Sequence, residues 1–276
     1  MDQKELEIRE YFVNLLEKKI HSVYKIENDI FSDTYYFNDA YVIKDYVKEE
    51  IPLLSLERMK SVYEYLQDDK LTDKNIVIDE YHKRRVSKLT HGDIGYKDEP
   101  NDSQLRGMAK NLKKLHKHVS EYDIPMDIVM DLYLFKRNAK ELISKVLENR
   151  IVREVKNIKD KTPIGLCHNL LRKENIIFKL DSVSIINYEL SNINYTYFDL
   201  ASFIHENLNS DASIKIFLST YFGSTFNSLK QKRVELFISF VSLYYYYYYQ
   251  YIYKLTKDDK YLPLIEKERR YLDSIK

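Results

Sequence analysis

The chain has 276 residues, and its hydrophobic content of 44% is enough to bury a sizeable core in one large domain or in two lobes. This composition excludes an intrinsically disordered protein. The 44 basic and 43 acidic residues leave a net charge of +1, so we expect no nucleic-acid partner, because dedicated nucleic-acid binders carry a basic surplus.

The first ninety or so residues are predicted to form a small sheet with one inserted helix. Apolar residues at helical spacing indicate an opening helix within the first twenty residues, and short β-prone runs follow it. Pro52 then opens a second helix, with an apolar stripe from Leu56 to Leu66. The expected strands cover residues 23–30, 34–37, 41–46, 75–81 and 85–89.

The remainder of the chain is predicted to be mainly helical and to contain one polar hairpin. Gly92, Gly95 and Pro100 mark a loop, so we place a boundary there between two lobes, residues 1–92 and residues 93–276. The expected helices cover residues 105–119, residues 126–148 and the chain from Phe198 onward, and the hairpin lies before the last of these. The predicted fold class is α+β.

Two further features bear on location. The single Cys167 cannot form an internal disulfide, and the charged opening MDQKELEIRE lacks the apolar stretch of a secretion signal, so we expect a cytoplasmic protein. Residues 236–253 carry no charge and approach the length of a membrane span. Because this segment is rich in tyrosine, which prefers the membrane interface to its centre, we predict a buried helix and no membrane span.

The hairpin carries the most informative motif of the chain. Leu166 begins the segment LCHNLLRKENIIF, which is followed by SIINYEL and then by YFDLASFIHE. Upstream, Tyr41 begins the strand-like segment YVIK, and Leu112 begins the helical segment LKKLH. In this order the segments resemble the choline/ethanolamine kinase family, which includes bacterial choline kinases, within the aminoglycoside phosphotransferase group. The resemblance implies a two-lobed protein-kinase-like fold, with a small antiparallel-sheet lobe and a large, mainly helical lobe.

The resemblance also implies roles for individual residues. Lys44 would hold the nucleotide phosphates, and Glu57 on the next helix would pair with Lys44. His168 would support the catalytic loop, and position 170 would carry the base that takes the proton of the attacking hydroxyl. The implied metal ligands are Asn175, Asn187 and Glu189, and the implied cofactors are ATP and Mg²⁺.

Three departures from the family pattern bear on activity. The base position holds Leu170, which cannot accept a proton, and the principal metal position holds Asn187, which offers only a neutral carbonyl where an Asp is expected. The turn over residues 28–34, which would cover the phosphates, contains no glycine to let backbone N–H groups approach them. These departures count against phosphoryl transfer and against the binding of ATP and Mg²⁺.

The tyrosine-rich helix has two interpretations. By resemblance, Tyr244, Tyr248 and Tyr251 would line a cleft beside residues 187–189 and enclose a small cationic metabolite such as choline through their ring faces. Alternatively the tyrosines fill the core, because six consecutive residues surround a helix and only about a third can face one pocket.

We predict a choline kinase-like protein that is catalytically impaired and acts as a small-ligand-binding or regulatory pseudokinase. An active choline, ethanolamine or related small-molecule kinase with atypical base and metal residues is the main alternative. A structural protein of the same fold, such as a spore-coat-type member, is a third. The sequence does not identify a protein partner.

Overall fold

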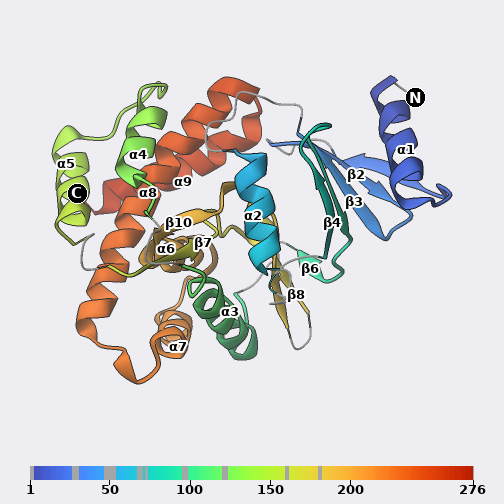
Figure 1. The fold of residues 1–276 in the computed structure, drawn as a ribbon. Coiled ribbons are helices and arrows are strands. Elements are labelled where there is room, and N and C mark those ends of the chain that lie inside the picture. Colours follow the sequence, from blue (N-terminus) through green and yellow to red (C-terminus); the bar gives the residue numbers. More distant parts are fainter. Residues whose placement is uncertain are drawn as a thin grey trace.

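The structure is a computed structural model that describes residues 3–26, 31–46, 54–66, 71, 74–94, 99–119, 124–158, 162–179 and 182–275. A small antiparallel sheet lies on one side of the molecule and a larger helical part on the other, with a single helix between them (Figure 1). This arrangement confirms the predicted α+β class.

The small sheet has five antiparallel strands in the order β1-β2-β3-β5-β4. They are β1 (Val23–Ile26), β2 (Asp33–Phe37), β3 (Tyr41–Asp45), β4 (Asn75–Asp79) and β5 (Arg84–Lys88). All five predicted strands are present, although residues 27–30 of the first prediction lie outside the described part of the chain.

Because side chains alternate along a strand, the two faces of this sheet contact different parts of the protein. Helix α1 (Gln3–Leu16) packs on one face, where Phe12 stacks on Phe37 with ring centroids 4.3 Å apart and Ile43 is fully buried. The next residue along β3, Lys44, points to the other face. There it lies opposite Arg85 of β5 in the ladder, so two cationic side chains share the face that looks toward the helical part.

Helix α2 (Leu56–Leu66) joins the sheet to the helical part and buries Met59, Val62, Tyr63 and Leu66. A second, three-stranded sheet orders β6 (Asp93–Ile94), β8 (Ile176–Phe178) and β9 (Val183–Ile185). The strand that follows residue 92 therefore already belongs to the sheet of the hairpin. The lobe boundary at residue 92 stays a prediction.

Helices make up most of the remaining chain. They surround a two-stranded sheet in which β7 (Ile164–Cys167) pairs with β10 (Asn192–Tyr195). The longest described helix, α8, packs against α4, α5, α6 and α9 and so lies at the centre of this part. The helices are α3 (Asp102–Leu115), α4 (Ile128–Lys136), α5 (Lys145–Ile158), α6 (Thr196–Asn207), α7 (Asp211–Phe222), α8 (Ser228–Thr256) and α9 (Leu262–Ser274).

The prediction of one helix over residues 126–148 is wrong, because α4 ends at Lys136 and α5 begins at Lys145. Between the two helices, backbone N–H groups donate hydrogen bonds to side chains of α8 (Ser228–Thr256) and not to carbonyl groups of the preceding helical turn. Gln250 accepts the N–H groups of residues 140 and 141 at 3.1 and 2.9 Å, and the Tyr247 hydroxyl accepts the N–H of Ile143 at 3.2 Å. A non-helical segment is tolerated here because its donors are satisfied.

The tyrosine-rich segment forms the buried centre of α8. All six consecutive tyrosines from Tyr244 to Tyr249 are at most 5% exposed. Within the described ranges, no helix combines the length and apolarity that crossing a membrane requires. The cytoplasmic location stays a prediction.

Candidate functional site

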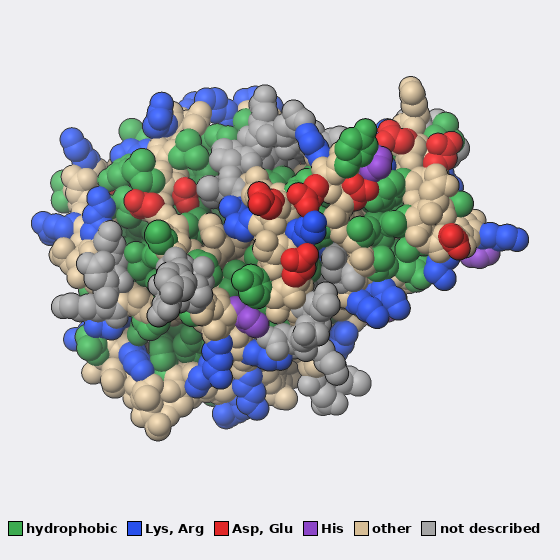
Figure 2. Space-filling view, in the orientation of Figure 1, with side chains coloured by type: hydrophobic (Ala, Val, Ile, Leu, Met, Phe, Trp, Pro, Cys, Tyr) green, Lys and Arg blue, Asp and Glu red, His purple; other side chains and the backbone are tan. Residues whose placement is uncertain are grey.

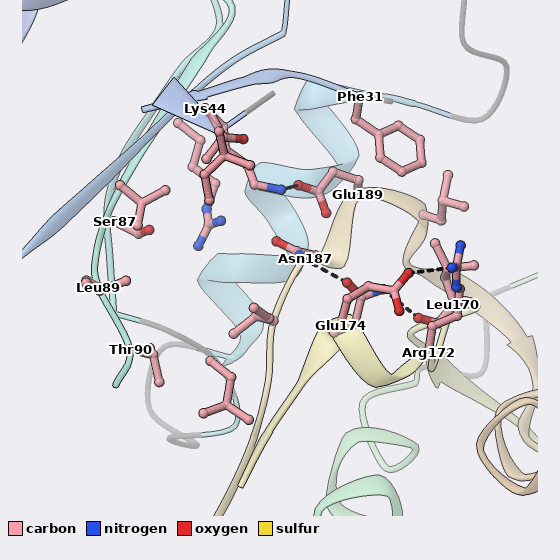
Figure 3. A pocket seen from close by; sticks show the side chains of 18 of the residues that line it. Phe31, Lys44, Ser87, Leu89, Thr90, Leu170, Arg172, Glu174, Asn187 and Glu189 are labelled. Atoms are coloured by element: carbon pink, nitrogen blue, oxygen red, sulfur yellow. Dashed lines mark hydrogen bonds and ion pairs between the residues drawn. The ribbon is translucent and has the colours of Figure 1, made fainter. Parts of the chain in front are cut away.

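A cleft of about 570 Å³ lies between the small sheet and the hairpin. Figure 3 shows Lys44 and Ser87 projecting into it from the sheet, and Leu170, Asn187 and Glu189 from the opposite wall. The cleft brings together most of the residues to which the sequence assigns a role. Those that line it are Lys44, Leu170, Asn175, Asn187, Glu189 and Tyr248.

The loop after β7 is held in shape by Asp199, a fully buried residue of α6. Its two carboxylate oxygens accept the backbone N–H groups of His168 and Asn169, each at 2.8 Å, and His116 Nε2 lies 3.1 Å from one of them. Asn169 adopts a left-handed backbone (φ 66°), which asparagine tolerates better than most residues. Asp199 therefore anchors this loop and does not project into the cleft.

His168 has a structural role. Its Nδ1 accepts the N–H of Leu170 at 3.3 Å, which assigns the proton to Nε2, and Nε2 then donates to the carbonyl of Ile186 at 2.9 Å. Burial lowers the pKa of His168, because the charged ring is disfavoured away from water. The neutral ring thus links the loop after β7 to the segment that follows β9.

Leu170 occupies the base position and lines the cleft with a side chain that cannot carry a proton. An ion pair stands beside it, in which Arg172 Nη2 lies 2.7 Å from Glu174 Oε1 (Figure 3). Arg172 also stacks over the ring of Tyr249 at 5.2 Å. Glu174, the acidic residue nearest to Leu170 along the chain, is therefore paired with Arg172, and Arg172 is itself held by the ring of Tyr249.

Asn175 and Asn187 hydrogen-bond to each other, with Asn187 Nδ2 donating to Asn175 Oδ1 at 2.9 Å. The amide of Asn175 also donates to the carbonyl of Leu170 at 2.8 Å. Asn187 has a left-handed backbone (φ 66°), so its side chain is directed by a tight turn at the end of the hairpin. The pair links the predicted metal positions by a direct contact.

Lys44 forms a buried ion pair with Glu189, with Nζ 2.6 Å from Oε1 and side chains only 7% and 1% exposed. The hydroxyl of Tyr46 donates to the same oxygen at 3.1 Å. The predicted partner Glu57 is instead exposed on the first turn of α2. The Lys44–Glu57 pairing is therefore wrong, because the buried stripe of α2 turns Met59 and Tyr63 inward and Glu57 outward.

The described residues do not fit a magnesium site of the phosphotransferase type. Mg²⁺ prefers anionic oxygens in octahedral geometry, but two of the three predicted ligands are neutral amides, and Asn175 Oδ1 already accepts a hydrogen bond from Asn187. Glu189 supplies the one negative charge among the three, and Lys44 offsets it. The second oxygen of Glu189, Oε2, is buried without a hydrogen-bond partner and is the one feature that would suit a cation.

Arg85 is a residue of the cleft that the sequence analysis missed. It is 2% exposed, lines the cleft and stacks over the ring of Tyr63 at 4.0 Å. The double arginine in a short strand was the available signal, since alternation directs the two side chains to opposite faces of the sheet, and both Arg84 and Arg85 are buried there. Together with Lys44 and the exposed Lys88, it makes the sheet wall of the cleft cationic.

The prediction that three tyrosines line the cleft is only partly right. Tyr248 lines it, whereas Tyr244 and Tyr251 do not. All three rings pack around Phe135 of α4, with centroids 5.3, 5.3 and 5.5 Å away for Tyr244, Tyr248 and Tyr251. Tyr261, from the short helical turn before α9, lies in the cleft wall with Tyr248. A cage of aromatic faces would therefore use these two rings.

Comparison with known proteins places this chain in a family. The family described as choline/ethanolamine kinase matches residues 58–262. Probable choline kinase 1 of Arabidopsis thaliana is 32% identical over 126 residues, which cover 39% of this chain and 34% of that protein. An uncharacterized protein of Metamycoplasma hominis is 26% identical over 229 residues, which cover 71% of this chain and 45% of that protein. The chain thus spans less than half the length of these two relatives.

Solved structures share the fold over nearly the whole chain. The choline kinase LicA of Streptococcus pneumoniae has a TM-score of 0.81 at 18% identity and covers 99% of this chain and 100% of its own. The aminoglycoside phosphotransferase APH(2")-IIa in complex with gentamicin has a TM-score of 0.70 at 17% identity, covering 99% and 96%. These likenesses confirm the protein-kinase-like fold.

Proposed function

Because the chain belongs to the choline/ethanolamine kinase family, we propose that it binds a small molecule in the cleft without transferring a phosphoryl group. The hydrogen bond between Asn187 and Asn175 carries this proposal. It joins two neutral amides where a kinase needs an anionic metal ligand, and Leu170 stands beside them where a kinase needs a base.

The expected loss of rate is large. A positioned general base contributes about 10² to 10⁴ in rate, and this factor is absent with Leu170. A metal ion contributes several kcal/mol of charge stabilisation to a phosphoryl transition state, and Asn187 adds no negative charge to hold one. With both missing, turnover falls far below the enzyme median of about 10 per second.

The wall of the cleft on the side of the large lobe, opposite the cationic sheet wall, is the one that suits a ligand with a cationic group. Tyr248 and Tyr261 present aromatic rings there, and Lys260 Nζ lies 5.2 Å from the centre of the Tyr261 ring, where a ligand ammonium would take its place. Glu174, which is paired with Arg172, adds a carboxylate to the same wall. A quaternary or primary ammonium gains about 0.5 to 2 kcal/mol from each aromatic face that it meets. Choline and similar amino alcohols are therefore the proposed ligand class.

Calorimetric titration of choline, without nucleotide, tests the binding half of the proposal. We expect saturable binding that Tyr248→Leu weakens by about 2- to 30-fold, the equivalent of one lost cation–π contact. Tyr251→Leu is the matched control, because Tyr251 lies one turn further along α8 and packs on Phe135 outside the cleft. Absence of binding at millimolar choline, in folded protein, would count against this ligand class.

One observation favours the alternative of an active kinase. The Oε2 oxygen of Glu189 is buried at the cleft without a hydrogen-bond partner, and a carboxylate oxygen is a ligand that Mg²⁺ accepts. If this alternative holds, choline-dependent ATP consumption will be measurable and Glu189→Gln will abolish it. Our proposal predicts no consumption above a buffer blank in either protein.

A further inference from the structure

A second cavity, of about 370 Å³, lies against α2 and shares no lining residue with the cleft. Its volume is within the range of small-molecule sites, which is roughly 300 to 1,000 Å³. The walls come from α2, from the chain that follows α3, and from strands β7 and β10. The lining residues are Arg58, Ser61, Val62, Tyr65, Lys117, His118, Val119, Leu166, Asn192 and Ile193.

The polar part of this cavity is basic. Arg58, Lys117 and His118 come from two different segments and converge on it, and none of the described lining residues is acidic. Burial lowers the pKa of Arg58, and the nearby carboxylate of Asp131 opposes that shift, so Arg58 remains a charged guanidinium in a partly dry setting. A guanidinium of this kind suits a carboxylate or phosphate, which it can contact through two N–H groups.

The charge around the cavity is divided between a basic side and an acidic side. Basic side chains dominate the lower part of the face in Figure 2, over α3 and α7, whereas acidic ones gather higher, over α2 and the small sheet. Helix α3 carries Arg106, Lys110, Lys113 and Lys114, and Lys117 follows it at the cavity. A run of like charge beside a cavity raises the local concentration of anions.

The other part of the cavity is apolar. Val62 and Leu166 are buried in its floor, and Val119 and Ile193 complete it. Tyr65 is 67% exposed at its rim, where a ligand ring could cover it. Ser61 and Asn192 add uncharged polar groups between the basic and apolar ends.

From this juxtaposition of a basic end and an apolar floor, we propose that the cavity behind α2 binds a small organic anion, a phosphate or carboxylate attached to an apolar body. This site shares no lining residue with the cleft, and it does not depend on what the cleft binds.

The absence of tryptophan from the chain allows a site-specific test. Tyr65→Trp places a single tryptophan at the rim of the cavity, and phenyl phosphate serves as the probe. We expect saturable fluorescence change on titration. The control Tyr81→Trp, at an 89% exposed residue outside the cavity, should show none. A flat titration with Tyr65→Trp up to about 10 mM would overturn the proposal.

Charge-removing variants in the Tyr65→Trp background identify the contacts. Arg58→Gln should weaken binding about tenfold, because a charge-assisted hydrogen bond is lost, and Lys117→Gln about two- to fivefold. Lys113→Gln, one helical turn before Lys117 and outside the cavity, should change it less than twofold. If Arg58→Gln does not fold, the comparison of phenyl phosphate binding between Lys117→Gln and Lys113→Gln decides whether the cavity binds the anion. Equal effects of these two, or a larger effect of Lys88→Gln in the cleft, would overturn the proposal.

Discussion

Removal of one partner from the Lys44–Glu189 ion pair should destabilise the fold strongly, and mutation can isolate the interaction between the two charges. Lys44→Met removes the ammonium and leaves Glu189, whose side chain is 1% exposed, as a buried charge. Removal of one partner of a buried pair costs about 3 to 5 kcal/mol. Because the Tyr46 hydroxyl still donates to Glu189 at 3.1 Å, we expect the lower end, about 3 kcal/mol.

An exposed pair between helix α2 and the turn after β4 provides the control. Lys60 and Glu80 are 2.8 Å apart, almost the same separation, but both side chains are 46% exposed. Exposed pairs contribute about 0.2 to 1 kcal/mol, so Lys60→Met should cost no more than that. The difference of about 2 kcal/mol or more between the two variants measures the effect of burial at nearly constant distance.

The assay is urea unfolding at pH 7 for wild type, Lys44→Met, Glu189→Leu and the double variant. The double variant removes both charges and should recover most of the loss, to within about 1 to 2 kcal/mol of wild type. Its coupling energy is then far from zero. If Lys44→Met costs less than about 1 kcal/mol, like Lys60→Met, the pair is solvated in solution and the reasoning is refuted.

Three further predictions concern stability. Burial raises the pKa of Asp131 to about 6, above its value in the unfolded chain, so its charge destabilises the fold at neutral pH and the penalty fades as the pH falls from 6 to 4. Asp131→Asn should therefore raise the free energy of unfolding by about 1 kcal/mol at pH 7.5, after discounting for solvent screening, and change it little at pH 4; an equal gain at both would contradict this. Gly165→Ala would place a Cβ 2.2 Å from the carbonyl oxygen of His116, so it should cost more than about 2 kcal/mol in thermal unfolding, whereas Gly107→Ala meets only a Val183 methyl at 3.2 Å and should cost less than about 1 kcal/mol. Asp199→Asn should cost about 3 kcal/mol, because a fully buried acceptor of two backbone N–H groups loses its charge, and a cost below about 1 kcal/mol would show that the loop does not depend on it.

Local pattern predicted the elements because the forces that set them are local. The β-prone run over residues 41–46 predicted a strand, and β3 covers Tyr41–Asp45. The order of the motif segments predicted one hairpin that carries His168, Asn175 and Asn187. In the structure Asn187 hydrogen-bonds to Asn175 at the cleft, and His168 bonds to the carbonyl of the residue before Asn187.

Partners that lie far apart in sequence were harder to predict. Glu189 is 145 residues from Lys44, and nothing near either residue specifies that contact. Glu57, by contrast, could have been rejected from the sequence. It lies two residues before Met59, or about 200° around the helix from the buried stripe, at 100° per residue.

The break between α4 and α5 depends on tertiary contacts. The sequence from 126 to 148 is compatible with one helix, and the segment departs from it because Gln250 and Tyr247 of α8 satisfy its backbone N–H groups. Similarly, six adjacent tyrosines cannot reveal from their sequence which one faces the cleft. Tyr244, Tyr248 and Tyr251 all pack against Phe135 of α4, and of these three Tyr248 also lines the cleft.

The most direct test of the proposed loss of catalysis is choline-dependent ATP consumption by wild type and by the double variant Leu170→Asp, Asn187→Asp, measured side by side. We predict that wild type stays at the buffer blank and that only the double variant gains measurable turnover, because base and metal ligand act as a unit. Each single variant controls for the added charge. Wild-type turnover near about 10 per second would contradict the proposal.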